Sequence, residues 1–132
     1  MKRISTLVGF AALSLLGASA IAHHSFTAVY DARSTIEIEG KVAQFQFRNP
    51  HSILHVLSTD ESGETTRWAI EWQGATALGA GGVSAATLLP GDPVIITGNP
   101  SRNPAEHRIR MLTIKRTTDG FGWGTGEGEV VD

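Results

Sequence analysis

The stretch TIEIEGKVAQFQF, residues 35–47, predicts one long β-strand whose alternation of apolar side chains changes parity half-way. Ile38 and Val42 share one parity, and Phe45 and Phe47 fall on the other. Successive side chains of a strand point to opposite faces, so a change of parity indicates one extra residue, which is a β-bulge. A bulged strand of this length is expected to bend and to pair with partners at both of its ends.

The residues around this strand predict an all-β fold. Gly40 lies inside the strand, where glycine is typical of a bend or a close backbone approach. We expect four more strands and two short helical segments at His51–Thr59, Thr65–Gln73, Pro93–Gly98, Glu106–Thr117, Ala75–Ala80 and Ser84–Leu88. This order predicts a small five-stranded OB-like barrel with a short helical connection between strands 3 and 4. An open five-stranded sheet or another small β-barrel is the alternative.

The first 22 residues have the features of a cleavable export signal. Lys2 and Arg3 precede an apolar run over residues 7–16, and Ala20-Ile21-Ala22 has the small-x-small pattern of a cleavage site. The apolar run is shorter than the ~20 residues that a membrane-spanning helix needs. We therefore expect a signal peptide at 1–22 and a periplasmic protein with no stable membrane span after cleavage. An uncleaved N-terminal anchor is the alternative.

Composition limits the remaining chain to one modest domain. We expect the barrel at 23–118, beginning with an extended lead-in anchored by Phe26 and Tyr30, and a flexible glycine-rich tail at 119–132. Cysteine is absent, so no disulfide supports the core. The formal charge is −2, and it becomes −4 without the leader, which carries two cations and no acid. A mildly acidic chain argues against nucleic acid as a partner.

Three histidines are candidate metal ligands. Cleavage after Ala22 places His23 and His24 at the mature N-terminus, where an α-amine and an imidazole lie together. His51 follows Asn49-Pro50 at a predicted chain reversal, and we expect it to complete the site. Nitrogen ligands favour copper(II) among the transition metals. His55 is excluded as a partner of His51, because four strand residues at ~3.3 Å separate them by ~13 Å.

Two other interpretations of these histidines stay open. Cleavage after Ala20 makes His23 the third residue, so that the α-amine, two backbone amides and its imidazole bind copper(II) in a square plane. Alternatively, the terminal histidines are solvated and His51 only forms a hydrogen bond within its turn.

Glu71 lies between two tryptophans on a predicted central strand. Trp68, Glu71 and Trp72 are therefore candidate ligand-binding residues for a non-metal module that binds a small molecule or a protein. Desolvation beside aromatic rings raises a carboxylate pKa towards the range of a general acid. An enzyme using Glu71 with His51 needs the two groups within about 4 Å or one water of each other. A structural Glu71, paired with Arg48 or Arg67 or facing water, is the interpretation that we favour, and no catalytic residue is assigned.

Four motifs resemble one known family over about residues 20–116. They are Ala22-His23-His24-Ser25-Phe26, Asn49-Pro50-His51, Trp68-Ala69-Ile70-Glu71 and Leu89-Pro90-Gly91-Asp92 through Gly98. They resemble the exported bacterial domain-of-unknown-function 6152 family. The resemblance implies a periplasmic, β-rich domain and brings no activity or cofactor with it. The Ala/Gly-rich segment 75–82 and the tail after Gly120 depart from the family pattern, and the histidine motifs do not.

The sequence therefore predicts a small periplasmic β-barrel binding protein. Its sharpest functional hypothesis is binding of copper(II), or another transition metal, by His23, His24 and His51.

Overall fold

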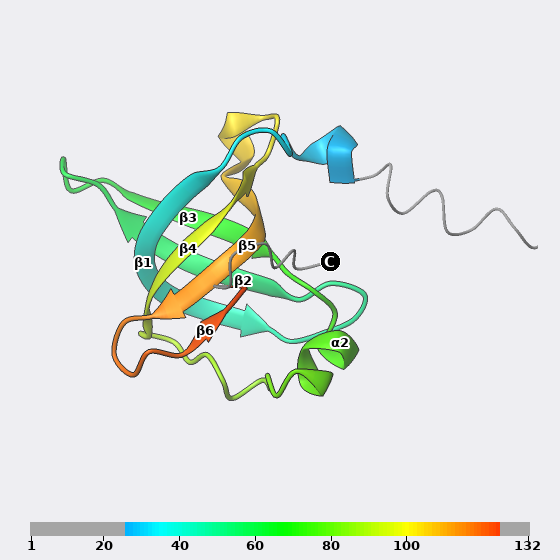
Figure 1. Cartoon of the computed structure of the whole chain (residues 1–132). Coiled ribbons are helices and arrows are strands. Elements are labelled where there is room, and N and C mark those ends of the chain that lie inside the picture. The colour runs from blue at the N-terminus through cyan, green and yellow to red at the C-terminus, as the bar shows by residue number, and fades with distance from the viewer. Residues whose placement is uncertain (1–25, 125–132) are drawn as a thin grey trace, which may run out of the picture.

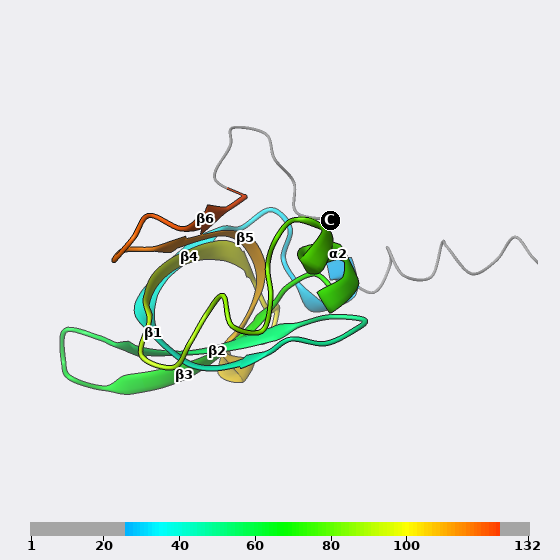
Figure 2. The ribbon, with the colours of Figure 1, turned by 90° about the horizontal axis from the view of Figure 1, so that it is seen from below.

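Five strands close into a barrel in the computed structural model, which describes residues 26–124. The strands are β1 (Ile36–Gln46), β2 (Ile53–Thr59), β3 (Thr65–Glu71), β4 (Pro93–Pro100) and β5 (Arg108–Arg116). They follow the order β3-β2-β1-β4-β5, and a parallel pairing of β3 with β5 closes the ring (Figures 1 and 2). Helix α2 (Ala75–Ala80) connects β3 to β4. The predicted OB-like barrel is confirmed.

The bend in β1 makes closure possible. Its first half pairs with β4 and its second half with β2, and the register shifts between Val42 and Gln44. The predicted bulge is therefore present. At Gly40 an added Cβ would lie only 2.3 Å from the carbonyl oxygen of Leu57. The backbones of β1 and β2 therefore approach so closely at the bend that only glycine fits at this position.

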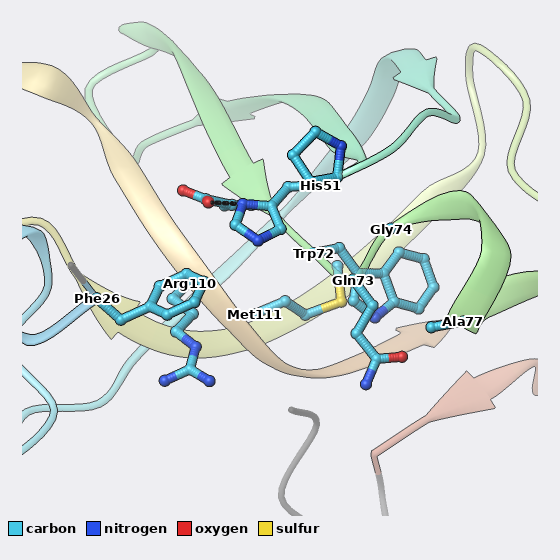
Figure 3. Close-up of a pocket in the computed structure, with 10 residues that line it drawn as sticks. Phe26, His51, Trp72, Gln73, Gly74, Ala77, Arg110 and Met111 are labelled. Atoms are coloured by element: carbon cyan, nitrogen blue, oxygen red, sulfur yellow. Dashed lines mark ion pairs between the residues drawn. The ribbon is translucent and has the colours of Figure 1, made fainter. Parts of the chain in front are cut away.

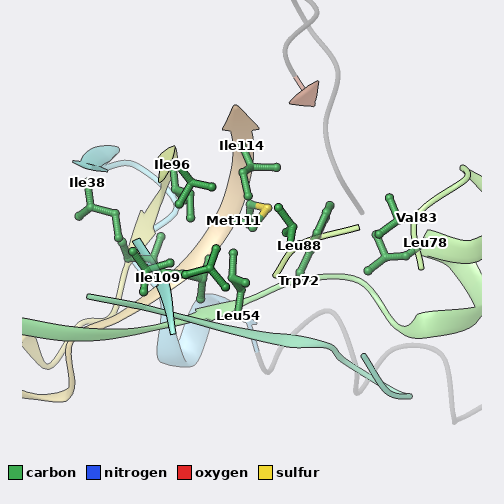
Figure 4. Close-up of a cluster of buried hydrophobic side chains, with 14 residues drawn as sticks. Ile38, Leu54, Trp72, Leu78, Val83, Leu88, Ile96, Ile109, Met111 and Ile114 are labelled. Atoms are coloured by element: carbon green, nitrogen blue, oxygen red, sulfur yellow. The ribbon is translucent and has the colours of Figure 1, made fainter. Parts of the chain in front are cut away.

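The barrel interior is filled by aliphatic side chains from every strand (Figure 4). Ile70 on β3 and Ile109 on β5 are both fully buried and face each other in register across the closing pair. Leu78 of α2 is also fully buried in this cluster, so the short helix covers part of the core. The buried cluster consists of Ile38, Val42, Leu54, Val56, Ile70, Trp72, Leu78, Val83, Leu88, Val94, Ile96, Ile109, Met111 and Ile114.

Residues 119–124, which we assigned to the start of a flexible tail, lie on the barrel. A short strand β6 (Gly122–Trp123) pairs with β5, and the Trp123 ring meets Trp72 edge-on at 5.7 Å between centroids. Gly81 provides the space, because a Cβ there would lie 2.1 Å from the Trp123 ring. Arg116 fixes the connecting turn through ion pairs of 2.8 Å with both Asp92 and Asp119. Residues 125–132 of the predicted tail lie outside the described residues.

Two local expectations differ from the structure. Segment 84–88 forms a turn instead of a helix, because the Ser84 and Thr87 side chains accept hydrogen bonds from the backbone and compete with helical pairing. Residues 26–29 form a helical turn, closed by a hydrogen bond from the Tyr30 N–H to the Phe26 carbonyl, where we expected extended chain. Within residues 26–124, no helix is long and apolar enough to span a bilayer.

Because of His55 on β2, we expect the free energy of unfolding to depend on pH. Burial, followed by repulsion from Arg67 and Arg48, lowers the pKa of this imidazole. The unfolded chain therefore binds the proton first as pH falls, so the free energy of unfolding decreases below about pH 6.5. We expect His55→Gln to reduce that decrease, measured by urea denaturation at about pH 7.5 and about pH 5.5. An identical decrease in the two proteins would contradict this assignment.

Candidate functional site

The loop between β1 and β2 carries His51 to the end of β3. The Asn49–Pro50 peptide bond in this loop is cis. Ser52 is fully buried, its N–H donates to the Gln73 carbonyl at 3.0 Å, and its own carbonyl accepts from the Trp72 N–H at 2.9 Å. These two backbone bonds extend the pairing of the strands and place His51 beside the last residue of β3, Glu71.

Gly74 lets the same loop pack against the start of α2. An added Cβ at Gly74 would lie 2.4 Å from the Pro50 carbonyl oxygen and 2.7 Å from Asn49 Oδ1. Asn49 holds the helix start in return, since its Oδ1 accepts from the Thr76 N–H at 3.1 Å and its Nδ2 donates to the Thr76 hydroxyl at 3.0 Å. The position of His51 therefore depends on a glycine three residues after Glu71.

Replacing Gly74 with alanine is expected to displace this loop. The new methyl group overlaps the Pro50 carbonyl, and overpacking of this kind costs about 1 to 3 kcal/mol of unfolding free energy. We expect Gly74→Ala to lower the urea midpoint and to shift the His51 imidazole resonances in NMR spectra. Gly79→Ala is the matched control, because nothing lies within 4 Å of its added Cβ. Equal effects of the two substitutions would contradict the packing described here.

The Glu71 carboxylate contacts three other side chains of the site. Its Oε1 lies 2.6 Å from His51 Nδ1, and its Oε2 accepts hydrogen bonds from the Tyr30 hydroxyl at 2.5 Å and from Arg108 Nη2 at 3.0 Å. The Glu71 side chain is 12% exposed, whereas those of His51 and Arg108 are 41% and 39% exposed. A buried carboxylate is thus held by three donors from three separate segments of the chain.

These contacts define which atoms carry protons. Burial and the neighbouring Glu71 carboxylate raise the pKa of the Tyr30 hydroxyl above its usual range, so this hydroxyl stays protonated and donates. An ionised carboxylate only accepts, so His51 Nδ1 carries the proton on the side facing Glu71. In the neutral imidazole, Nε2 is then the atom with a free lone pair. A carboxylate behind one ring nitrogen is typical of a histidine that binds a metal, or accepts a proton, through the other.

A cavity of about 180 Å³ opens beside His51 (Figure 3). Phe26 stacks at a tilt on the His51 ring, with 5.2 Å between centroids, and Arg110 covers the Phe26 ring at 4.3 Å. Trp72 and Met111 form apolar walls. The described lining of the cavity includes no serine, threonine or cysteine, so it offers no hydroxyl or thiol nucleophile to His51.

The three residues that we expected to bind one ligand line two different cavities. Glu71 and Trp72 line the cavity beside His51. Trp68 lines a separate cavity of about 270 Å³ near Pro100 and Arg108, and its ring stacks on His107 at 5.3 Å between centroids. Glu71 pairs with Arg108 instead of the expected Arg48 or Arg67.

The predicted metal ligands lie partly beyond the described region. His51 is placed as above, whereas His23 and His24 lie outside residues 26–124. Within residues 26–124, no three His, Cys, Asp or Glu side chains are grouped as metal ligands. The distance of 2.6 Å between His51 and Glu71 meets the 4 Å condition set for an acid–base pair.

Comparison with known proteins places the chain in one family. No curated protein sequence matches it. Among solved structures, the small single-stranded DNA-binding protein from Streptomyces coelicolor is similar with a TM-score of 0.40 and 20% identity, over 64% of this chain and 92% of that chain. The model of a family of unknown function, DUF6152, matches residues 11–110. The chain therefore belongs to the DUF6152 family.

Proposed function

We propose that this protein is a periplasmic metal-binding protein that holds copper(II), or another transition metal, between its mature N-terminus and His51. Cleavage after Ala22 supplies the α-amine and imidazole of His23, with His24 as a further imidazole. His51 Nε2 supplies the ligand from the barrel. Glu71 orients His51 and does not bind the metal itself.

The observation that carries the proposal is the set of donors around Glu71. His51 Nδ1 is fixed at 2.6 Å by a carboxylate that Tyr30 and Arg108 hold in place. Such a partner sets the tautomer and ring orientation of a ligating histidine. A histidine that only forms a hydrogen bond within its turn does not require a carboxylate partner that two further segments of the chain hold in place.

The length of the chain before Phe26 supports the same pairing. Phe26 packs on His51 at 5.2 Å between ring centroids and lines the cavity, and His24 and His23 precede it by two and three residues in the sequence. Consecutive Cα atoms are about 3.8 Å apart, which keeps the Cα of His24 within about 8 Å of that of Phe26 and the Cα of His23 within about 11 Å. The proposed shared ion therefore requires only a short tether between Phe26 and the terminal histidines.

The ligand chemistry favours copper(II). An amine with two or three imidazole nitrogens suits copper(II), which also binds such sites more tightly than the other divalent first-row metals. The nitrogens must be deprotonated, so the affinity is expected to fall as pH decreases.

Blocking the α-amine tests this proposal. An α-amine has a pKa of about 8 and a lysine of about 10.4, so the terminus is acetylated selectively near neutral pH. Copper(II) titration of the chain beginning at His23 is expected to give a 1:1 complex that acetylation weakens by about 100-fold. Unchanged affinity after acetylation would contradict the proposal.

The mature N-terminus itself provides a second check. Mass spectrometry of the protein isolated from the periplasm is expected to give a chain beginning at His23. A chain beginning at Ile21 would contradict the proposed site and favour the square-planar complex at the terminus alone.

A further inference from the structure

Arg110 differs from the other arginines near the site. Arg108 pairs with Glu71 at 3.0 Å, and Arg116 pairs with Asp92 at 2.8 Å. Arg110 has no carboxylate within ion-pair distance among residues 26–124, although Glu71 lies opposite it in the β3–β5 register. Both oxygens of Glu71 already accept from other donors. Among residues 26–124, the positive charge of Arg110 at the cavity is therefore uncompensated.

The Arg110 guanidinium lies over an aromatic ring at the cavity. Arg110 lies over the Phe26 ring at 4.3 Å, and both residues line the cavity (Figure 3). A guanidinium that stacks through its face keeps the N–H groups along its edges free. Those edges match the two oxygens of a carboxylate, which they bind with paired, charge-assisted hydrogen bonds.

Trp72 adds a second donor without an acceptor. Its residue is 3% exposed, and its indole nitrogen has no hydrogen-bond partner among the described residues. A buried indole N–H normally finds a partner, and an unmade hydrogen bond is costly. Trp72 forms a wall of the same cavity as Arg110. The cavity wall thus carries the Arg110 charge beside an indole ring whose own N–H is buried, and both oxygens of the nearest carboxylate already accept from other donors.

The remaining lining sets the size and character of the ligand. Phe26, Pro50, Ala77 and Met111 contribute apolar surface. The cavity volume of about 180 Å³ exceeds the ~150 Å³ of an engineered protein cavity that binds benzene. A ring-sized apolar body fits, and a typical drug-sized ligand, which needs roughly 300 Å³ or more, does not.

We propose that the cavity beside His51 binds a small monocarboxylate whose apolar body is about the size of one ring. Arg110 holds the carboxylate, Phe26 and Met111 contact the apolar body, and the Trp72 ring forms a wall that reports on occupation of the cavity. This site uses neither the N-terminal histidines nor a metal ion, and because the proposed copper ligand His51 lines the same cavity, the carboxylate is tested without metal.

Benzoate and benzamide test the proposal as a matched pair, because they share a ring and differ in charge. The mature protein is titrated with each in metal-free buffer, and the indole N–H resonances are followed by NMR. Trp72→Phe identifies which of the three tryptophan signals belongs to Trp72. We expect benzoate to shift the Trp72 signal saturably at millimolar concentration, and benzamide to bind about tenfold more weakly or not at all.

Arginine substitutions locate the anion. Arg110→Gln is expected to raise the dissociation constant for benzoate about tenfold or more, whereas Arg67→Gln, on the exposed surface of β3, leaves it within about twofold. Comparison of the free spectra shows that each variant is folded. Absence of a saturable benzoate shift, equal binding of benzamide, or unchanged binding in folded Arg110→Gln would each overturn the proposal.

Discussion

Replacement of His51 by alanine is expected to weaken copper(II) binding by the mature chain by about 100-fold or more. The variant removes the one barrel ligand of the proposed site, so only the amine and the terminal imidazoles remain. Its fold is expected to persist, because the His51 side chain is 41% exposed and the adjacent Ser52 makes the backbone bonds that hold the loop. Competition titration against a copper chelator of known affinity measures the loss.

His107→Asn is the matched control for this loss. His107 stacks on Trp68 beside the second cavity, and asparagine tolerates its left-handed backbone at φ 48°. We expect this variant to bind copper(II) like the unchanged protein. If His51→Ala and His107→Asn had the same affinity, His51 would not be a ligand.

Replacement of Glu71 by alanine is expected to lower the free energy of unfolding by about 2 to 3 kcal/mol. Removal of a buried ion-pair partner costs about 3 to 5 kcal/mol, and the partial exposure of His51 and Arg108 reduces this value. The Tyr30 residue is 2% exposed, so its hydroxyl loses a buried acceptor in the variant. Urea denaturation at neutral pH measures the change.

Glu39→Ala provides the comparison on the surface. Glu39 is an exposed residue of β1, and substitution at such a position usually changes stability by less than about 0.5 kcal/mol. Equal destabilisation by the two variants would show that the contacts around Glu71 contribute nothing beyond an ordinary surface charge.

The barrel was predictable because its determinants are local in sequence. The parity change between Val42 and Phe45 and the glycine at position 40 indicate a bent strand from sequence alone, and the structure has the bulge there. The packing of residues 119–124 on the barrel was not predictable in the same way. Trp123 follows a segment of glycine and polar residues with Phe121 as its one apolar side chain, and its packing on Trp72 depends on a gap at Gly81 that no periodicity indicates.

The candidate site was only half predictable. His51 and Glu71 attract attention as a histidine after Asn-Pro and an acid between tryptophans. Their contact arises because Ser52 bonds to the end of β3, which depends on strand register. Tyr30 and Arg108 reach Glu71 from 41 and 37 residues away in the chain, and no local pattern signals such contacts. Arg110 was missed because an unpaired arginine is recognised only when its neighbours are known.

Electron paramagnetic resonance of the copper(II)-loaded mature chain tests whether His51 is a ligand of the metal. Imidazole and amine nitrogens bound to copper(II) split its signal, so the spectrum reports the ligand set. With ¹⁵N-labelled histidine, we expect a signal from the His51 imidazole that disappears in His51→Ala. The signals from the nitrogens of the N-terminus are expected to remain. Identical spectra for the unchanged protein and His51→Ala would contradict it, because the metal would then be bound without the barrel.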